Sequence, residues 1–193
     1  MATLNASNYT IGQAEIWFTE EEAKNPTVGT TVATLMISFG NITVAEIAPD
    51  VSYAEHYISV KGNRRKDKQV AVSKSISIPF TFDELNTNNI RLFMLGTTIN
   101  AASYMPVMKK ESFEGRAIIN FQTDVGNNFI YVIPKVNLRA DGALGFSSED
   151  WMAANFVLEV LYHSTYKVDA SPSLELAPYG YIGFNESAIG SPF

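Results

Sequence analysis

Apolar and polar side chains alternate along several segments of the chain, and this pattern predicts β-strands. From Val70 to Phe82 every second residue is mostly apolar, and the intervening residues are mostly small and neutral. Such alternation places apolar side chains on one face of a strand and polar side chains on the other. The same reasoning predicts strands at 13–18, 39–47, 51–60, 115–123 and 129–138. The chain is therefore expected to be mainly β.

Turns and the last strand complete the predicted sheet. Gly62-Asn63 and Asp141-Gly142 are turn signals, and 124–128 reads as a hairpin loop. Pro134 has no N–H to donate, so it is expected at an edge or a bulge. Segment 154–162 is apolar at both odd and even positions, which predicts a strand covered on both faces.

One helix is predicted, over residues 84–95. Asp83 is the expected N-cap, and Gly96 occupies the C′ position where helices often end. Leu85, Leu92 and Phe93 fall near one face, so we expect that face to pack on the sheet.

The length of 193 residues favours a single domain over residues 1–193. Residues 169–193 are expected to form an irregular C-terminal segment, because serines and prolines gather there. The chain has no cysteine, its start lacks the features of a secretory signal, and no apolar run reaches the length of a membrane span. We expect a soluble protein made in a cytoplasm, with no membrane partner.

The surface is expected to be lightly charged. Charged residues make up 18% of the chain, against about 25% in an average globular domain. Interface centres are depleted in charge, so this composition suits a subunit that covers itself with copies of itself. The net charge of −6 argues against a free-standing nucleic-acid binder.

Residues arranged for catalysis are not found. The two histidines, His56 and His163, have no second histidine or cysteine near them in sequence, so a zinc site is not predicted. Nucleophile elbows, phosphate-binding glycine loops and dinucleotide fingerprints are missing. The acidic stretches 20–22 and 149–150 are interpreted as solvated loops. We therefore expect no enzyme activity, no cofactor and no bound metal.

The strongest local charge feature is a basic cluster between two predicted strands. Its members are Lys61, Arg64, Arg65, Lys66 and Lys68. One interpretation is a solvated hairpin tip whose charge discourages unwanted strand pairing. The other is a loop that binds phosphate or a partner; we favour contacts between subunits or between rings of subunits, because stacked surfaces need complementary charge.

Ordered motifs along residues 10–165 resemble the major tail tube proteins of tailed bacteriophages and, more distantly, the inner-tube proteins of contractile injection machines. The resemblance rests on the order of these motifs along the chain. The motifs are Gly12–Phe18, Gly40-Asn41-Ile42, Gly62–Lys68, Phe80–Leu85, Asn88-Asn89-Ile90, Leu95-Gly96, Val136–Gly142 and Glu149-Asp150-Trp151.

The resemblance implies an antiparallel β-sandwich or flattened barrel with one flanking helix. It also implies a virion protein, assembled in the host cytoplasm, whose homohexameric rings stack into a tail tube. Its expected partners are copies of itself, an initiator or baseplate, a terminator and, where the tail has one, a sheath. Double-stranded DNA would pass through the lumen without specific binding, and an acidic wall would repel its phosphates.

Two alternatives stay open. One is another component of a tail or injection machine, such as a terminator, a decoration protein or a secretion-system tube. The other is a β-sandwich module that binds a ligand such as a sugar, for which Tyr179, Tyr181 and Phe184 would supply aromatic surface.

Overall fold

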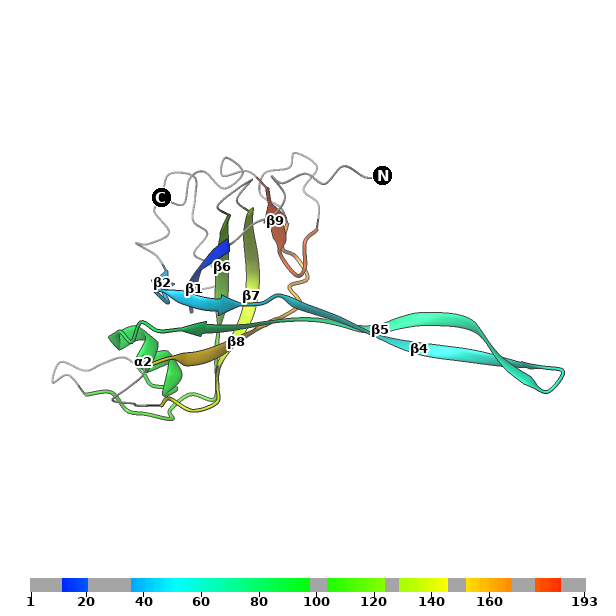
Figure 1. Cartoon of the computed structure of the whole chain (residues 1–193), viewed down its shortest axis with the longest axis horizontal. Helices are drawn as coiled ribbons and strands as arrows, with labels where there is room; N and C mark the ends of the chain where they lie inside the picture. The colour runs from blue at the N-terminus through cyan, green and yellow to red at the C-terminus, as the bar shows by residue number, and fades with distance from the viewer. Residues whose placement is uncertain are drawn as a thin grey trace.

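Nine strands and one helix make up the described part of the protein (Figure 1). This computed structural model describes residues 12–20, 36–97, 104–123, 129–145, 152–167 and 176–184. In chain order the elements are β1 (Gly12–Thr19), β2 (Ile37–Ser38), β3 (Ile42–Ala45), β4 (Ala48–Val60), β5 (Asn63–Phe82), α2 (Thr87–Phe93), β6 (Phe113–Thr123), β7 (Phe129–Asp141), β8 (Ala154–Val160) and β9 (Tyr181–Gly183). Within this part, no helix is long and apolar enough to cross a bilayer.

The strands form one antiparallel sheet in the order β2-β1-β6-β7-β8-β5-β3, with β4 joined to β5 and β9 joined to β7. In Figure 1, β6 and β7 run across the direction of β5 and β8, so the sheet bends over itself. Its two ends approach, because β3 contacts β1 and residues of both strands line one cavity. The predicted mainly β architecture with one flanking helix is confirmed.

An aromatic cluster fills the space between the layers. Phe39 lies with its ring centroid 4.9 Å from that of Phe80 and 5.4 Å from that of Phe156, and Phe82 stacks on Phe156 at 5.2 Å. All four side chains are fully buried. Ring pairs at these spacings stabilise the core beyond the area they bury. The alternation that predicts β5 is therefore correct where the strand crosses the body.

Strand β7 changes partners along its length, and Pro134 lies at the change. Residues up to Val132 pair with β9, and residues from Val136 pair with β8. On its other side, the register with β6 shifts opposite this point, between Gly115 and Ala117. A proline is tolerated there because the ladder is already interrupted, so its predicted place at a bulge is confirmed.

The helix is shorter than predicted. It begins at Thr87, and Asn86 is the N-cap, whose side chain accepts from the N–H of Asn89 at 2.9 Å. Asp83 is not the cap because its carboxylate accepts both hydrogen bonds from the amide of Asn41. At the other end the left-handed residue is Leu95, with φ 50°, and not Gly96. The predicted packing face is confirmed, since Leu85, Leu92 and Phe93 all contact the core.

Other boundaries also differ from the sequence prediction. The segment predicted as one strand over 39–47 contains only the four residues of β3, because Phe39 turns inward and β4 begins at Ala48. Strand β8 ends at Val160, and only one of its faces is buried; Asn155 is exposed and Glu159 is half-buried. Part of the expected irregular C-terminal segment forms β9. The 124–128 loop, Glu149-Asp150 and Trp151 lie outside the described residues.

Candidate functional site

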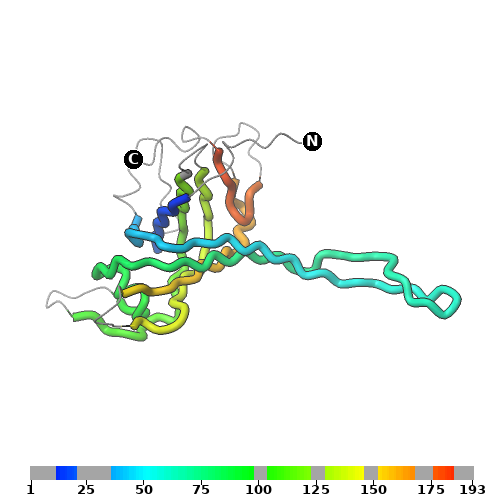
Figure 2. Tube along the Cα trace, viewed as in Figure 1, coloured from blue at the N-terminus to red at the C-terminus, as the bar shows by residue number. Residues whose placement is uncertain are grey.

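A long two-stranded arm leaves the body of the protein (Figure 2). It consists of β4 and the first part of β5, paired in antiparallel register from Ala48↔Ser77 to Val60↔Asn63. Its 13-residue strand β4 corresponds to a length of about 40 Å. Every residue from 48 to 75 is exposed. This arm carries all five residues of the predicted basic cluster, so it is the candidate functional site.

The tip of the arm is a tight turn. Lys61 and Gly62 are the two turn residues, with φ 49° and 83°, and Val60 pairs with Asn63 across them. Two left-handed residues fit the twist of a hairpin, and glycine adopts this conformation without strain. The expected hairpin turn is confirmed, but the expected loop over 61–68 is wrong. Arg64, Arg65, Lys66 and Lys68 lie on strand β5 itself.

Two irregularities in register divide the arm into distinct faces. The pairing shifts between Ser52 and Tyr53 and again between His56 and Tyr57, leaving Val72 and Asp67 of β5 without an opposite residue. Bulges of this kind increase the twist of a ribbon and exchange the faces on which the following side chains lie. Val70 therefore lies on the face opposite to Ile76, although the sequence spacing placed both on one face.

On one face of the tip, Lys66 is paired with an acid of its own chain. Lys66 and Tyr57 both donate hydrogen bonds to the carboxylate of Glu55. The hydrogen bond from Lys66, followed by that from Tyr57, lowers the pKa of Glu55, while the same carboxylate raises the pKa of Tyr57. The guanidinium of Arg64 lies 4.5 Å from the centre of the Tyr57 ring. The four side chains form one compact cluster.

On the opposite face, the positive charge is available. His56 Nδ1 lies 2.6 Å from Asp67 Oδ1. Across the two strands, His56 lies opposite Lys68, and Ile58 lies opposite Arg65. Within the described ranges, neither Arg65 nor Lys68 is placed in an ion pair. Ile58 and Val60 are exposed on this face at 41% and 39%. It therefore combines free cations with apolar surface, and we call it the cationic face, defined by Ile58, Val60, Arg65 and Lys68.

Charge is distributed unevenly between the arm and the rest of the chain. Residues 48–75 contain six Lys or Arg residues and three acidic residues, a formal charge of +3. The whole chain carries −6, so the remaining residues carry −9. A basic projection on an acidic body is a charge pattern that favours association between copies.

The outer face of the body sheet carries a groove at the base of the arm. It is a cavity of about 600 Å³ between β5, β7 and β8, and it continues into a second one of about 230 Å³ that shares Pro79 and Asp141. Glu159 in this groove is paired with Arg139 at 2.6 Å. Glu46 and Asp141 are exposed, and neither is placed in an ion pair with a described residue. Val157 and Leu161, both half-buried, add apolar surface.

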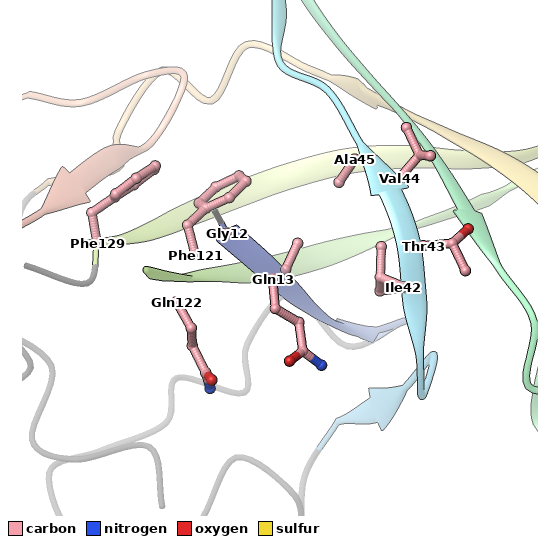
Figure 3. A pocket seen from close by; sticks show the side chains of 10 residues that line it. Gly12, Gln13, Ile42, Thr43, Val44, Ala45, Phe121, Gln122 and Phe129 are labelled. Carbon is pink, nitrogen blue, oxygen red and sulfur yellow. The ribbon is translucent and has the colours of Figure 1, made fainter. Parts of the chain in front are cut away.

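A separate cavity lies where the two ends of the sheet approach (Figure 3). It has about 240 Å³, and its lining side chains come from β1, β3, β6 and β7. Phe121 and Phe129 stack there with centroids 4.5 Å apart. The described residues of its lining include no charged residue, histidine, serine or cysteine. Thr43 supplies a hydroxyl, but none of these lining residues could act as its general base.

The remaining residues considered in the sequence do not gather into a site. His56 lies on the arm and His163 on the body, beside Tyr166. In the part of the chain that the structure describes, no three His, Cys, Asp or Glu residues are close enough to hold a metal. Glu20, interpreted as part of a solvated loop, instead forms ion pairs with Arg91 at 2.7 Å and with Lys110. That interpretation is wrong for Glu20, while Glu21 and Glu22 lie outside the described residues.

The acidic groove is the part of the surface that sequence reasoning missed. Glu46, Asp141 and Glu159 are 95 and 18 residues apart along the chain, and the strand order brings them to one face. The one available signal was the alternation in 154–160, where Asn155, Val157 and Glu159 separate the buried residues. Because segment 154–162 was interpreted as apolar on both faces, this alternation was not recognised.

Comparison with known proteins places the chain in a family. No curated protein is similar enough to the chain to count as a match. One family matches residues 5–107, more than half of the 193 residues, including the whole arm and the helix. The chain therefore belongs to the family described as "Protein of unknown function UCP028589".

Proposed function

We propose that this protein is a structural subunit that binds copies of itself and builds a bacteriophage-type tail tube. The observation that carries the proposal is the arm over residues 48–75, which is exposed along its whole length. An isolated two-stranded hairpin is only marginally stable in water. A partner that covers the arm would therefore stabilise it.

The arm has two properties that favour a partner made of protein. Among the described strands, β4 pairs only with β5, and β5 pairs only with β4 before Ile76, so these strands leave the outer backbone edges of the arm unpaired. It also exposes large apolar side chains, including Tyr53 at 53% and Val72 at 67%. Unpaired edges and exposed apolar patches are typical of surfaces that pair with another chain.

A copy of the same chain is the partner with the best charge match. An arm of +3 and a body of −9 attract each other between copies, and such contacts between different surfaces are heterologous. Heterologous contacts close into rings or continue into filaments, as a tube of stacked hexameric rings requires. The acidic body would also repel the phosphates of DNA, so that DNA slides through a lumen.

The location and the partners follow from this role. The tube would belong to a virion tail, assembled in the host cytoplasm, and would meet an initiator, a terminator and, in tails that have one, a sheath. The cavity between the two ends of the sheet gives no support to an enzyme role, because its described lining residues are uncharged. In this proposal the protein is not an enzyme and needs no cofactor.

A ligand-binding module is less well supported. Of its three proposed aromatic residues, Tyr181 stacks on Tyr166, and Tyr179 packs edge-to-face on Tyr162. The Tyr179 carbonyl also accepts a hydrogen bond from Tyr131, whose pKa is raised by burial to about 12. Phe184 alone of the three is largely exposed, at 69%. These contacts make the segment part of the body.

Electron microscopy of the purified full chain tests the proposal. The matched variant replaces residues 53–72 by Asn-Gly, so that the hydrogen-bonded pair Ser52 and Ser73 flanks a two-residue turn. The arm packs little against the core, so the variant should keep the melting temperature of the full chain. We expect rings and tubes with a central channel from the full chain and monomers from the variant.

The outcomes separate the alternatives. Single rings that never stack would favour a terminator, and a full chain that stays monomeric at millimolar concentration would contradict self-assembly and favour a binding module. Tubes formed equally well by the shortened variant would show that the arm is not the element that joins the subunits.

A further inference from the structure

We infer that the acidic groove at the base of the arm is the docking surface for the cationic face of the arm of a second copy. This inference rests on the proposed self-assembly and names the two surfaces that meet. The groove is lined by β5, β7 and β8 and extends toward Glu46. The cationic face is the set already defined, Ile58, Val60, Arg65 and Lys68.

The two surfaces are complementary in charge. Arg65 and Lys68 supply two cations that no acid of their own chain neutralises within the described residues. In the groove, Arg139 neutralises Glu159, which leaves Asp141 and Glu46 as the available acids. Two free cations therefore face two free acids. Complementary charges of this kind raise the rate of association and fix the register of the partners.

Their apolar parts are complementary as well. Ile58 and Val60 are exposed beside the two cations, and Val157 and Leu161, both half-buried, line the groove beside the acids. Pro79 lies between the two cavities on β5. Burying the apolar residues would contribute affinity that salt does not screen, while the charge pairs select the orientation.

An arm that docks in the groove belongs to another copy, because the tether keeps each arm away from its own groove. Strand β5 runs without a break from the tip of the arm into the groove, where Ser75 and Ser77 are part of the lining. The tip is separated from the groove by a paired ribbon of about 40 Å. Figure 1 shows the arm extending away from the body, so an arm cannot fold back onto its own groove.

Alternative surfaces fit the arm less well. The described residues that line the cavity between the two ends of the sheet include no acid, so they cannot form an ion pair with Arg65 or Lys68. On the body, Glu20 is already held by Arg91 and Lys110. Among the described acids, those in the groove combine exposure, a cavity and neighbouring apolar side chains.

A charge exchange tests the inference directly. One variant carries Arg65→Glu and Lys68→Glu, a second carries Glu46→Lys and Asp141→Lys, and a third carries all four substitutions. Sedimentation of the full chain at about 0.1 M salt measures self-association. We expect each double variant to associate about 100-fold more weakly than the wild type, because like charges then face each other. The fourfold variant should return to within about 10-fold of the wild type.

Matched controls separate specific contacts from net charge. Lys109→Glu with Lys167→Glu changes the net charge as the first variant does, and Glu111→Lys with Glu114→Lys changes it as the second does. All four control positions are exposed and outside both surfaces. Association of each control should stay within about 3-fold of the wild type. Thermal unfolding verifies that every variant is folded.

Crosslinking gives a second readout that does not depend on reversed charges. Since the chain has no cysteine, Ile58→Cys and Val157→Cys introduce the only two thiols. A short bis-maleimide should join a chain with the first substitution to a chain with the second. Ile58→Cys mixed with Val107→Cys, an exposed position on the body, is the control and should give little of this product.

The results distinguish this inference from the proposed function. A wild type that does not associate overturns both. A wild type that associates, together with double variants that associate normally, overturns the docking surface and leaves self-assembly intact. A fourfold variant no better than the double variants, with no crosslink between positions 58 and 157, also overturns it. Rescue by the fourfold variant together with the crosslink supports it.

Discussion

Lys66 donates a hydrogen bond to Glu55 across the two strands of the arm, so one of the five clustered cations is neutralised inside its own chain. Tyr57 donates to the same carboxylate, and Arg64 lies over the ring of Tyr57. The paired Lys66 and the ring contact of Arg64 lie on one face, and Arg65 and Lys68 lie on the cationic face. The basic cluster is therefore divided between two faces of the arm, although the sequence presents it as one.

The pair predicts the titration of Glu55. The hydrogen bond from Lys66 lowers the pKa of Glu55 below its ordinary value of 4.5. A depressed carboxylate pKa means that the pair is fully formed at neutral pH and is lost as the pH falls through the folded pKa. Carbon-13 NMR should show the carboxyl of Glu55 titrating below 4.5. Lys66→Ala should move that midpoint upward, and an unchanged midpoint would contradict the pair.

Glu20 should matter more for stability than an exposed acid does. Partial burial opposes its ionisation, but hydrogen bonds from Lys110 and Arg91 outweigh burial and lower the pKa of Glu20. Its contribution is therefore present above the ordinary glutamate pKa and lost as the pH falls through the lowered value. Glu20→Gln should reduce the free energy of unfolding by about 1 kcal/mol at pH 7.

The control for Glu20 is Glu111→Gln, which removes an exposed acid of the same body. The difference between the two variants should shrink as denaturation is measured at progressively lower pH, below about 4. A difference that stays constant with pH would show that the ion pairs with Arg91 and Lys110 do not stabilise the fold.

Asn89 should be one of the most sensitive polar positions. Its side-chain amide donates to the carbonyl of Phe39 at 3.0 Å and to that of Glu84 at 2.8 Å, and the residue is fully buried. Removing the donor leaves buried carbonyls unsatisfied, at about 1–3 kcal/mol each. Asn89→Ala should therefore cost about 2–4 kcal/mol of unfolding free energy in urea denaturation. Asn88→Ala, on an exposed neighbour, should cost less than about 1 kcal/mol.

The helix also predicts an order among its apolar residues. Leu92 is fully buried, Phe93 is half-buried with its ring 5.8 Å from that of Phe156, and Ile90 is exposed. Leu92→Ala should cost about 2–5 kcal/mol. The usual loss of about 3–5 kcal/mol for a buried aromatic is an upper bound for Phe93→Ala, because part of its ring stays in water. Ile90→Ala should cost least. A reversed order would show that a different face of the helix packs on the sheet.

Period-two alternation predicted the strands because it reports directly on which side chains face a core. It failed where no second layer of the same chain exists. Val70 and Val72 continue the apolar alternation of β5, but they are exposed at 51% and 67%. From sequence alone, apolar residues that meet another chain cannot be distinguished from those that meet their own. The arm was therefore predicted as two strands, without its projection from the body.

Local signals failed where distant residues compete for the same group. Asp83 has the residue type of an N-cap, but Asn41 binds its carboxylate; Asn86 is the N-cap, and the helix begins at Thr87. The grouping of acids in the groove also depends on residues that are distant in sequence. Glu46, Asp141 and Glu159 meet because β3, β5, β8 and β7 are consecutive in the sheet. Such neighbours follow from strand order, which no local pattern in the sequence contains.

Removing cations from the tip of the arm distinguishes a role in assembly from DNA binding. The triple variant Arg64→Ser, Arg65→Ser and Lys66→Ser removes cations from both faces of the tip. Its melting temperature should stay within about 2 °C of the wild type, since residues 48–75 are exposed and contribute little to the core. Tubes should become shorter and fewer on microscopy grids, and the loss should be larger at high salt, where the remaining charge pairs are screened.

A matched variant with Lys109→Ser, Lys135→Ser and Lys167→Ser removes the same charge from the body and should form tubes of normal length. Both variants are also mixed with double-stranded DNA at about 0.05 M salt, where phosphate contacts are strongest. If the arm joins subunits, the wild type and both variants bind DNA equally weakly, because the body carries −9. Normal tubes from the arm variant, or salt-sensitive DNA binding that only the arm variant loses, would instead make the tip a phosphate-binding element.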